Sequence, residues 1–394
     1  MSRAATQTIA IFHDAYRELN AKRLFWIVMI ISVVIVAAFA LVGLTDKGLK
    51  VIVWEIPIPF FNRSTMEPAM FYKMIFVNLG IGFWLSWGAT ILAIISTASI
   101  IPEFVSSGSI ELTLSRPVSR LRLFLTKYLT GLLFVALQVT VFTLAAFVVI
   151  GFKGDAWMPK LFWAIPIVVL FFSYLFSICA LVGLLTRSTI AALLITLLMW
   201  LFFFGLNATD GIFVSLRETT RLRENVLAKR VERLERNASL RIWEKRRAEA
   251  GEPAPPEGTP PPVYTPAEID AENPLIQNQR TKLAAERASL AKWTRWASIF
   301  YWVKTPLPKT SETLALLERT LISEEELERL RTPNDDQPVA FGEQDDVQVS
   351  AREAQLGSEK ALRARSTAWI IGTSLGFEAF ILGIACVIFC RRDF

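Results

Sequence analysis

Six long apolar segments constrain the fold of this chain more than any other feature of its sequence. Each is about 17 to 30 residues long, and about 20 apolar residues in a helix cross the hydrocarbon core of a bilayer. The 394-residue chain is 53% hydrophobic, which exceeds the usual apolar fraction of a soluble domain. The sequence therefore predicts an all-α membrane protein with six transmembrane helices. The segments are Leu24–Leu44, Met74–Ile101, Leu123–Phe152, Leu161–Leu185, Ile190–Leu206 and Thr367–Cys390.

The distribution of lysine and arginine among the connecting loops predicts the orientation of these helices. Six crossings place both ends of the chain on the same side of the membrane. If that side is the cytoplasm, the short inner segments carry eleven Lys and Arg residues and the short outer loops carry six. Basic residues concentrate in short cytoplasmic loops. We therefore expect a protein of the cytoplasmic (inner) membrane with both termini in the cytoplasm.

Residues 207–366 form a polar insertion between the fifth and sixth segments. They hold 25 of the 42 basic and 26 of the 36 acidic residues, so the positive excess lies in the remaining chain. This placement favours contact with anionic lipid or an acidic partner and argues against nucleic acid. Leu216–Ala250 and Pro274–Trp296 show helical spacing on either side of the proline-rich stretch Gly251–Pro262. We expect an extracytoplasmic, coiled-coil-like helical hairpin, with a charged and partly disordered linker as the alternative.

The chain lacks the short motifs that mark common active sites. There is no G-x-x-x-x-G-K-[ST] to cradle phosphates, and no G-x-S-x-G, H-E-x-x-H or C-x-x-C. His13 is the only histidine, and Cys179, Cys386 and Cys390 lie in or beside apolar segments. We therefore expect no enzymatic activity, no bound cofactor and no metal site. If ATP drives this protein, the nucleotide must bind another polypeptide.

The loop between the second and third segments, residues 102–122, carries the tightest motif in the chain. Within the sequence IPEFVSSGSIELTLSRPVSRLRLFLTK, the residues that define it are Glu103, Gly108, Glu111, Arg116, Pro117 and Arg120. The loop resembles the first cytoplasmic loop of ABC-2-type transporter permeases, with the approximate pattern E…SGT-x-E-x-L-x-S-R-P-x-S-R…K. Ser109 replaces the usual threonine and keeps its hydroxyl. The last six residues, FCRRDF, resemble the closing tail of the same family.

The resemblance implies a permease subunit of an ATP-driven exporter. It assigns the six motif residues to the region that contacts a cytoplasmic ABC ATPase, which would bind ATP and magnesium. It also implies a homodimer or paired permeases around one translocation path. The domains would then be an amphipathic elbow helix over 1–23, helices one to five over 24–206, the insertion over 207–366, and the last helix with its tail over 367–394. If the arginines of loop 102–122 only set topology, these residues need no partner.

Three polar residues within the apolar segments are candidates for a translocation path. They are Glu378, Asn78 and Gln138. A charge near the middle of a span is costly, so it usually faces the bundle interior or a wet cavity. Glu378 would line the path, or it would hydrogen-bond to a neighbouring helix at Asn78 or Gln138. An alternative function for the whole chain is a non-transporting membrane scaffold whose outer arm binds a partner in the cell envelope.

Overall fold

The computed structural model describes residues 23–57, 67–106, 119–252, 261–323 and 349–392, apart from the side chains of Leu24 and Ala351. The chain divides into two compact units. The bundle unit consists of Met1–Asn207, Lys304–Thr332 and Ser366–Phe394, and the arm unit of Ala208–Val303 and Pro333–Arg365. The elbow helix predicted over 1–23 lies outside the described residues, apart from Arg23 at the start of the first described helix.

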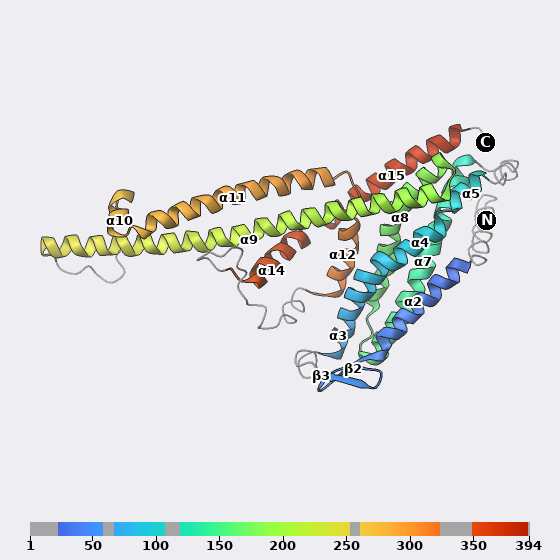
Figure 1. The fold of residues 1–394 in the computed structure, drawn as a ribbon, viewed down its shortest axis with the longest axis horizontal. Coiled ribbons are helices and arrows are strands. Elements are labelled where there is room, and N and C mark those ends of the chain that lie inside the picture. Colours follow the sequence, from blue (N-terminus) through green and yellow to red (C-terminus); the bar gives the residue numbers. More distant parts are fainter. Residues whose placement is uncertain (1–22, 58–66, 107–118, 253–260, 324–348, 393–394) are drawn as a thin grey trace. The chain divides into compact units, whose positions relative to one another are not determined.

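Long apolar helices make up the bundle unit (Figure 1). Among the described residues, five helical runs are long and apolar enough to cross a membrane, and Phe25–Leu41 is a shorter apolar helix. The prediction of a largely helical chain with several apolar helices long enough to span a membrane is confirmed, whereas six crossings stay a prediction. The five runs are Pro68–Val105, Arg120–Lys153, Pro159–Thr186, Thr189–Ala250 and Thr367–Arg391. The elements are α2 (Arg23–Leu41), α3 (Pro68–Ile75), η1 (Phe76–Ala89), α4 (Thr90–Thr97), α5 (Ile100–Ser106), α7 (Arg120–Lys153), η2 (Pro159–Trp163), α8 (Ala164–Thr186), the first part of α9 (Thr189–Ala250), α12 (Thr310–Leu321) and α15 (Thr367–Arg391).

Aromatic side chains fill the core of the bundle unit. Helix α7 packs against α2 and α8, and α8 packs against α15. A methyl group at Gly131 of α7 would lie 2.3 Å from the ring of Phe176 of α8, so the two helices approach closely at this glycine. The largest side chains that are almost fully buried here include Phe76, Phe124, Phe134, Phe142, Phe171, Phe172, Tyr174 and Phe389.

A small antiparallel sheet follows the first helix. The prediction of an apolar helix to Leu44 was three residues too long, because α2 ends at Leu41 and the chain then turns into strands. The strands β1 (Val42–Thr45), β2 (Gly48–Val51) and β3 (Trp54–Pro57) lie in the order β1-β2-β3, with Val42 opposite Val51 and Val51 opposite Trp54. The hydroxyl of Tyr72 donates to the carbonyl of Val42 at 2.8 Å, which fastens the sheet to α3.

The fifth apolar segment does not end where the polar insertion begins. The prediction placed the end of the helix at Leu206, but α9 continues through it to Ala250 as one helix of 62 residues. This stretch contains no proline to interrupt it. Helix α9 ends at Gly251, whose φ of +65° suits a glycine, and the amide of Glu252 bonds back to the carbonyl of Arg247 at 3.1 Å.

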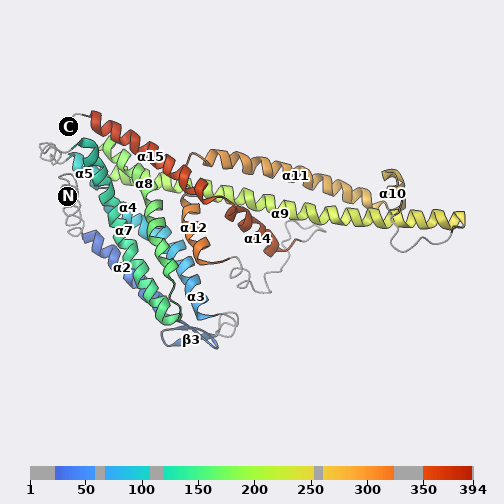
Figure 2. The ribbon, with the colours of Figure 1, turned by 180° about the vertical axis from the view of Figure 1, so that it is seen from behind.

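The arm unit contains an antiparallel pair of helices, seen from two sides in Figures 1 and 2. The later part of α9 packs against α11 (Leu275–Lys304). The two helices are antiparallel, because residues later in α9 pair with residues earlier in α11. Glu224 pairs with Arg287 at 3.0 Å and Glu235 with Arg280 at 2.7 Å. A helical hairpin is therefore present, and its location outside the cytoplasm stays a prediction. The unit also holds α10 (Pro266–Glu272) and α14 (Ala351–Arg363), and α14 was not predicted.

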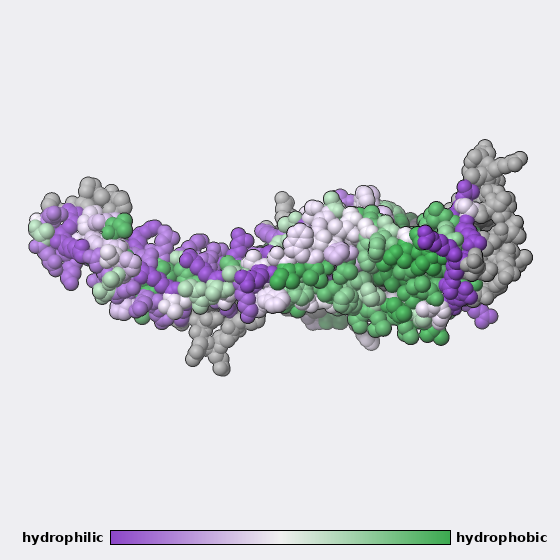
Figure 3. Space-filling view, turned by 90° about the horizontal axis from the view of Figure 1, so that it is seen from above, coloured by the Kyte–Doolittle hydropathy of each residue, from purple (hydrophilic) through white to green (hydrophobic). Residues whose placement is uncertain are grey.

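The surfaces of the two units differ in character. On the face seen in Figure 3, hydrophobic side chains predominate on the bundle unit and hydrophilic ones on the arm unit. Large apolar side chains are exposed along α2, α9 and α15, including Ile30, Leu198 and Phe380 at 60%, 65% and 66%. An apolar helix face of this kind is stable in a bilayer, where lipid tails replace water.

Candidate functional site

The residues predicted to contact an ATPase are only partly described. Glu103 is exposed on the short helix α5, and Arg120 is the first residue of α7. The side chain of Ser119 caps α7 by accepting a hydrogen bond from the amide of Arg122 at 3.3 Å. Gly108, Glu111, Arg116 and Pro117 lie outside the described residues. The structure thus shows the two helices that lead into and out of the predicted contact segment.

Two arginines tie three helix ends together at this end of the bundle unit. Nη1 of Arg120 donates to the carbonyl oxygens of Arg392 at 2.9 Å and Cys390 at 3.3 Å, where α15 ends. Nη1 of Arg392 in turn donates to the carbonyl oxygen of Leu184 at 2.7 Å, in the last turn of α8. The last carbonyls of a helix lack partners within it and carry partial negative charge, so a guanidinium is a suitable cap. We call this pair of residues the arginine clasp.

Aromatic side chains of α5, α7 and α15 pack together next to the arginine clasp. The side chain of Phe389 is fully buried, and its ring lies 6.1 Å from that of Phe104 on α5 and 5.5 Å from that of Phe124 on α7. The ammonium of Lys127 lies over the Phe104 ring at 5.6 Å. The last turn of α15 therefore contacts both helices that flank the predicted contact segment. In the sequence, the only sign of this contact was the resemblance of the last six residues to the closing tail of ABC-2-type permeases.

Glu378 is buried within the bundle unit, but its partners are not the predicted ones. Its carboxylate oxygens accept hydrogen bonds from the hydroxyls of Tyr128 on α7 at 2.8 Å and Ser173 on α8 at 2.7 Å. Glu378 thus hydrogen-bonds to neighbouring helices, as one of the two predictions had it, but through Tyr128 and Ser173 and not through Asn78 or Gln138. The structure therefore uses Glu378 to join α15 to α7 and α8.

Neither Asn78 nor Gln138 is hydrogen-bonded to Glu378. The amide of Asn78 donates to the carbonyl of Met74 in its own helix at 3.0 Å. Gln138 is 2% exposed, and none of the described residues bonds to its side-chain amide. The three residues proposed for one path thus do not form a single polar site within the bundle unit.

Asn78 instead borders a cavity of about 270 Å³ in the bundle unit. Its walls come from η1, α8, α9 and α12, and they include Trp87 and Trp200, whose ring centroids are 4.9 Å apart. Ser86 and Thr310 also line it. Ser86 donates to the carbonyl of Ile81, five residues earlier, which fits the wide π-type turn of η1.

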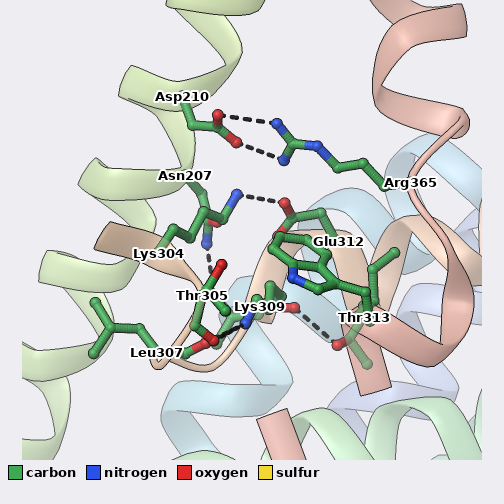
Figure 4. Close-up of polar contacts among 12 residues, drawn as sticks. Asn207, Asp210, Lys304, Thr305, Leu307, Lys309, Glu312, Thr313 and Arg365 are labelled. Atoms are coloured by element: carbon green, nitrogen blue, oxygen red, sulfur yellow. Dashed lines mark hydrogen bonds and ion pairs between the residues drawn. The ribbon is translucent and has the colours of Figure 1, made fainter. Parts of the chain in front are cut away.

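A cluster of buried charges belongs to the segment that leads back into the bundle unit (Figure 4). Lys304 forms an ion pair with Glu312, and both side chains are at most 10% exposed. Lys309 is fully buried, and its ammonium donates to the carbonyl of Leu307 at 3.0 Å, to the carbonyl of Thr305 and to the hydroxyl of Thr373. It also lies 4.5 Å from the centre of the Trp369 ring. The burial and partners of Lys304 and Lys309 show that both anchor this segment.

This cluster lies within the polar insertion, residues 207–366, which was expected to be an extracytoplasmic loop with a helical hairpin. Within it, Lys304–Leu321 packs with the bundle unit through α12. Leu314, Leu317 and Leu321 on α12 are buried there. Within the arm unit, Arg365 and Asp210 form a two-armed ion pair at 2.6 and 3.0 Å (Figure 4).

No group of three or more His, Cys, Asp and Glu side chains that could hold a metal occurs among the described residues. Residues 25–209 match the model of a family described as a protein of unknown function, DUF2705. That match covers less than half of the chain. No curated protein and no solved structure matches the chain.

Proposed function

We propose that this chain is the membrane-spanning permease subunit of an ATP-driven transporter of the ABC-2 type, acting as an exporter. The observation that carries the proposal is the loop motif from Glu103 to Arg120, in its order and spacing. Its support in the structure is the position of that loop between α5 and α7, whose ends are joined through the last turn of α15. Such a mechanical link suits an element that passes force from an ATPase to the spans.

The proposed topology has six crossings with both termini in the cytoplasm of the inner membrane. The five long apolar runs supply five crossings. The helix Phe25–Leu41 supplies the sixth, because 17 residues rise about 26 Å and this is the lower limit for crossing a bilayer. In this topology the arginine clasp faces the cytoplasm and the arm unit belongs to the opposite side.

The proposed mechanism divides the work between subunits. ATP and magnesium bind a separate ABC ATPase, because the chain has no phosphate-binding loop. Two permease subunits, identical or paired, enclose the path. Closure of the ATPases moves the loop between α5 and α7, and the attached helix ends change which side of the path is open.

The first experiment is purification of the tagged chain in mild detergent, followed by an assay for a co-purifying ATPase. We expect a P-loop ATPase with the native chain and its loss with Glu103→Ala and Arg116→Ala. The matched controls are Glu55→Ala and Lys153→Ala, which remove exposed charges of the same sign from β3 and from the far end of α7. Equal loss in the controls, or no ATPase with a well-folded native chain, would contradict the permease function.

A second candidate function is a non-transporting scaffold, and the arm unit is the observation that favours it. Its helices expose many charged side chains, and Arg236 and Glu232 pair on its surface at 3.1 Å with more than 60% of each exposed. In this case a partner should bind the arm and no ATPase should co-purify. Deleting residues 253–260, which follow α9 in the sequence, would leave ATPase binding intact for a permease, whereas a scaffold that uses this segment would lose its partner.

A further inference from the structure

We propose that Arg120 and Arg392 are positioning residues. They fix the start of α7, which follows the ATPase-contacting loop, to the ends of α8 and α15. This inference rests on the proposed function. It differs from the resemblance, which groups Arg120 with the residues that touch the ATPase. In the structure the guanidinium of Arg120 is directed instead at the backbone of the chain's own last turn.

The first step of the argument is the location of Arg120. Arg120 is the first residue of α7 and follows the contact segment in the sequence. A displacement of that segment would therefore reach α7 through Arg120. One nitrogen, Nη1, donates to two carbonyl oxygens, of Arg392 and Cys390. An arginine with donors engaged in this way fixes the start of α7 to the end of α15.

The second step is the continuation of the link through Arg392. The backbone carbonyl of Arg392 accepts a hydrogen bond from the Arg120 guanidinium. Its own side chain donates to the carbonyl of Leu184 and so caps the end of α8. A single residue therefore serves as acceptor for one helix and donor for another. Helix α8 ends at Thr186, and the next residue, Arg187, has a positive φ of 52° that turns the chain into α9, so the link also reaches the α8–α9 corner.

The third step is the other flank of the loop. Phe104 on α5 stacks against Phe389, three residues before Arg392. Close packing of α5 on α8 is shown at Gly183, where an added methyl group would lie 3.0 Å from the ring of Pro102. Both flanks of the contact segment thus rest on residues 389–392, and the tail acts as a common anchor.

Arg391 provides a matched control. It has the same charge as Arg392, is its neighbour in sequence, ends α15 and is exposed. No hydrogen bond or ion pair joins its side chain to another described residue. Replacing Arg391 therefore changes the local charge as replacing Arg392 does, without opening the clasp.

The test measures ATPase affinity on the folded, gel-filtered fraction of the full-length chain, so that any loss of stability does not enter the result. We expect Arg120→Ala and Arg392→Ala to weaken binding of the co-purifying ATPase about tenfold, the effect of losing one charge-assisted hydrogen bond. Arg120→Lys and Arg392→Lys should recover part of the affinity, because lysine retains a charged donor. Arg391→Ala should bind as the native chain does.

A second readout is independent of the ATPase. Cys390 is exposed and its carbonyl accepts from Arg120, so its rate of maleimide labelling reports on the clasp in a Cys386→Ala background. The rate should rise in Arg120→Ala and stay unchanged in Arg391→Ala. Native affinity and native labelling in Arg120→Ala and Arg392→Ala would overturn this inference alone. Absence of any ATPase with the native chain would overturn the proposed function and this inference with it.

Discussion

Gly131 is the residue at which the close packing of α7 on α8 can be tested most directly. An alanine there would place its methyl group 2.3 Å from the ring of Phe176, which is itself buried between Tyr128 and Phe172. We expect Gly131→Ala to lower the free energy of unfolding by about 1–3 kcal/mol, because the ring has no space to move. Thermal unfolding in detergent measures this. Gly376→Ala is the control, since nothing lies within 4 Å of its added methyl group, and an equal loss there would contradict the packing argument.

Glu378 is a buried acid that joins α15 to α7 and α8 through the hydroxyls of Tyr128 and Ser173. The hydroxyl of Tyr128 has a second acceptor in the carbonyl of Ser173 at 2.9 Å, and the hydroxyl of Ser173 has one in Leu170 at 2.8 Å. Removal of the acid therefore leaves neither hydroxyl without an acceptor. Its contribution should appear in the pairwise coupling between the residues rather than in one large single loss.

A double-mutant cycle measures that coupling. We expect Tyr128→Phe and Glu378→Ala to interact by about 0.5–3 kcal/mol in the free energy of unfolding. Additive effects would show that the hydrogen bond stabilises nothing. Glu378→Gln keeps the shape of the side chain, so membrane abundance should stay at the native level. If export also stays unchanged in that variant, Glu378 has no part in a translocation path.

At the scale of the element, the start of α10 contains a carboxylate whose pKa can be followed. Glu268 accepts hydrogen bonds from the amide of Thr265 at 2.9 Å and from its hydroxyl at 2.8 Å, and it pairs with Arg246. The Thr265 amide, followed by Arg246 and the Thr265 hydroxyl, lowers the pKa of Glu268 from about 4.5 to about 2. Since the folded-state pKa is lowered, the capping contacts stabilise α10 fully above about pH 4.5 and lose their effect as the pH falls towards 2.

The Thr265 amide reports on this titration. In the full-length chain labelled with ¹⁵N-threonine, its chemical shift should titrate with a midpoint near pH 2, where the Glu268 carboxylate protonates. The shift should not titrate in Glu268→Gln. A midpoint at the ordinary value of about 4.5 would contradict the capping contacts.

The elements that were predicted and those that were missed differ in the range of the interactions that form them. The apolar spans follow from local composition, so they could be located without knowledge of their neighbours. The end of the fifth span could not, because a change from apolar to polar residues at Asn207 contains no helix breaker. Lys309 and Arg392 depend on partners 64 and 208 residues away, at Thr373 and Leu184, and sequence spacing does not reveal such pairs.

At the scale of the whole molecule, the proposed membrane topology depends on which helix ends lie at the same end of the bundle unit. The bundle end with the arginine clasp contains the end of α5, the start of α7 and the ends of α8 and α15. The end of α7 lies by α3 instead, since Gly154 is close to Ala69 and Tyr72. Helix α7 therefore runs from the clasp to the opposite end of the bundle unit.

Chemical labelling from one side of the membrane tests the topology of the complete chain. Cys390 is exposed beside the clasp, and Lys245 is exposed on the α9 part of the arm unit. In intact spheroplasts, a membrane-impermeant maleimide should label Lys245→Cys in a Cys390→Ser background and should label native Cys390 only after permeabilisation. The physical reason is the apolar segment of α9, whose hydrophobic stretch separates Thr189 at one end from the charged arm at the other. Labelling of both cysteines in intact cells would place the clasp and the arm on one side, and α9 would then not cross the membrane.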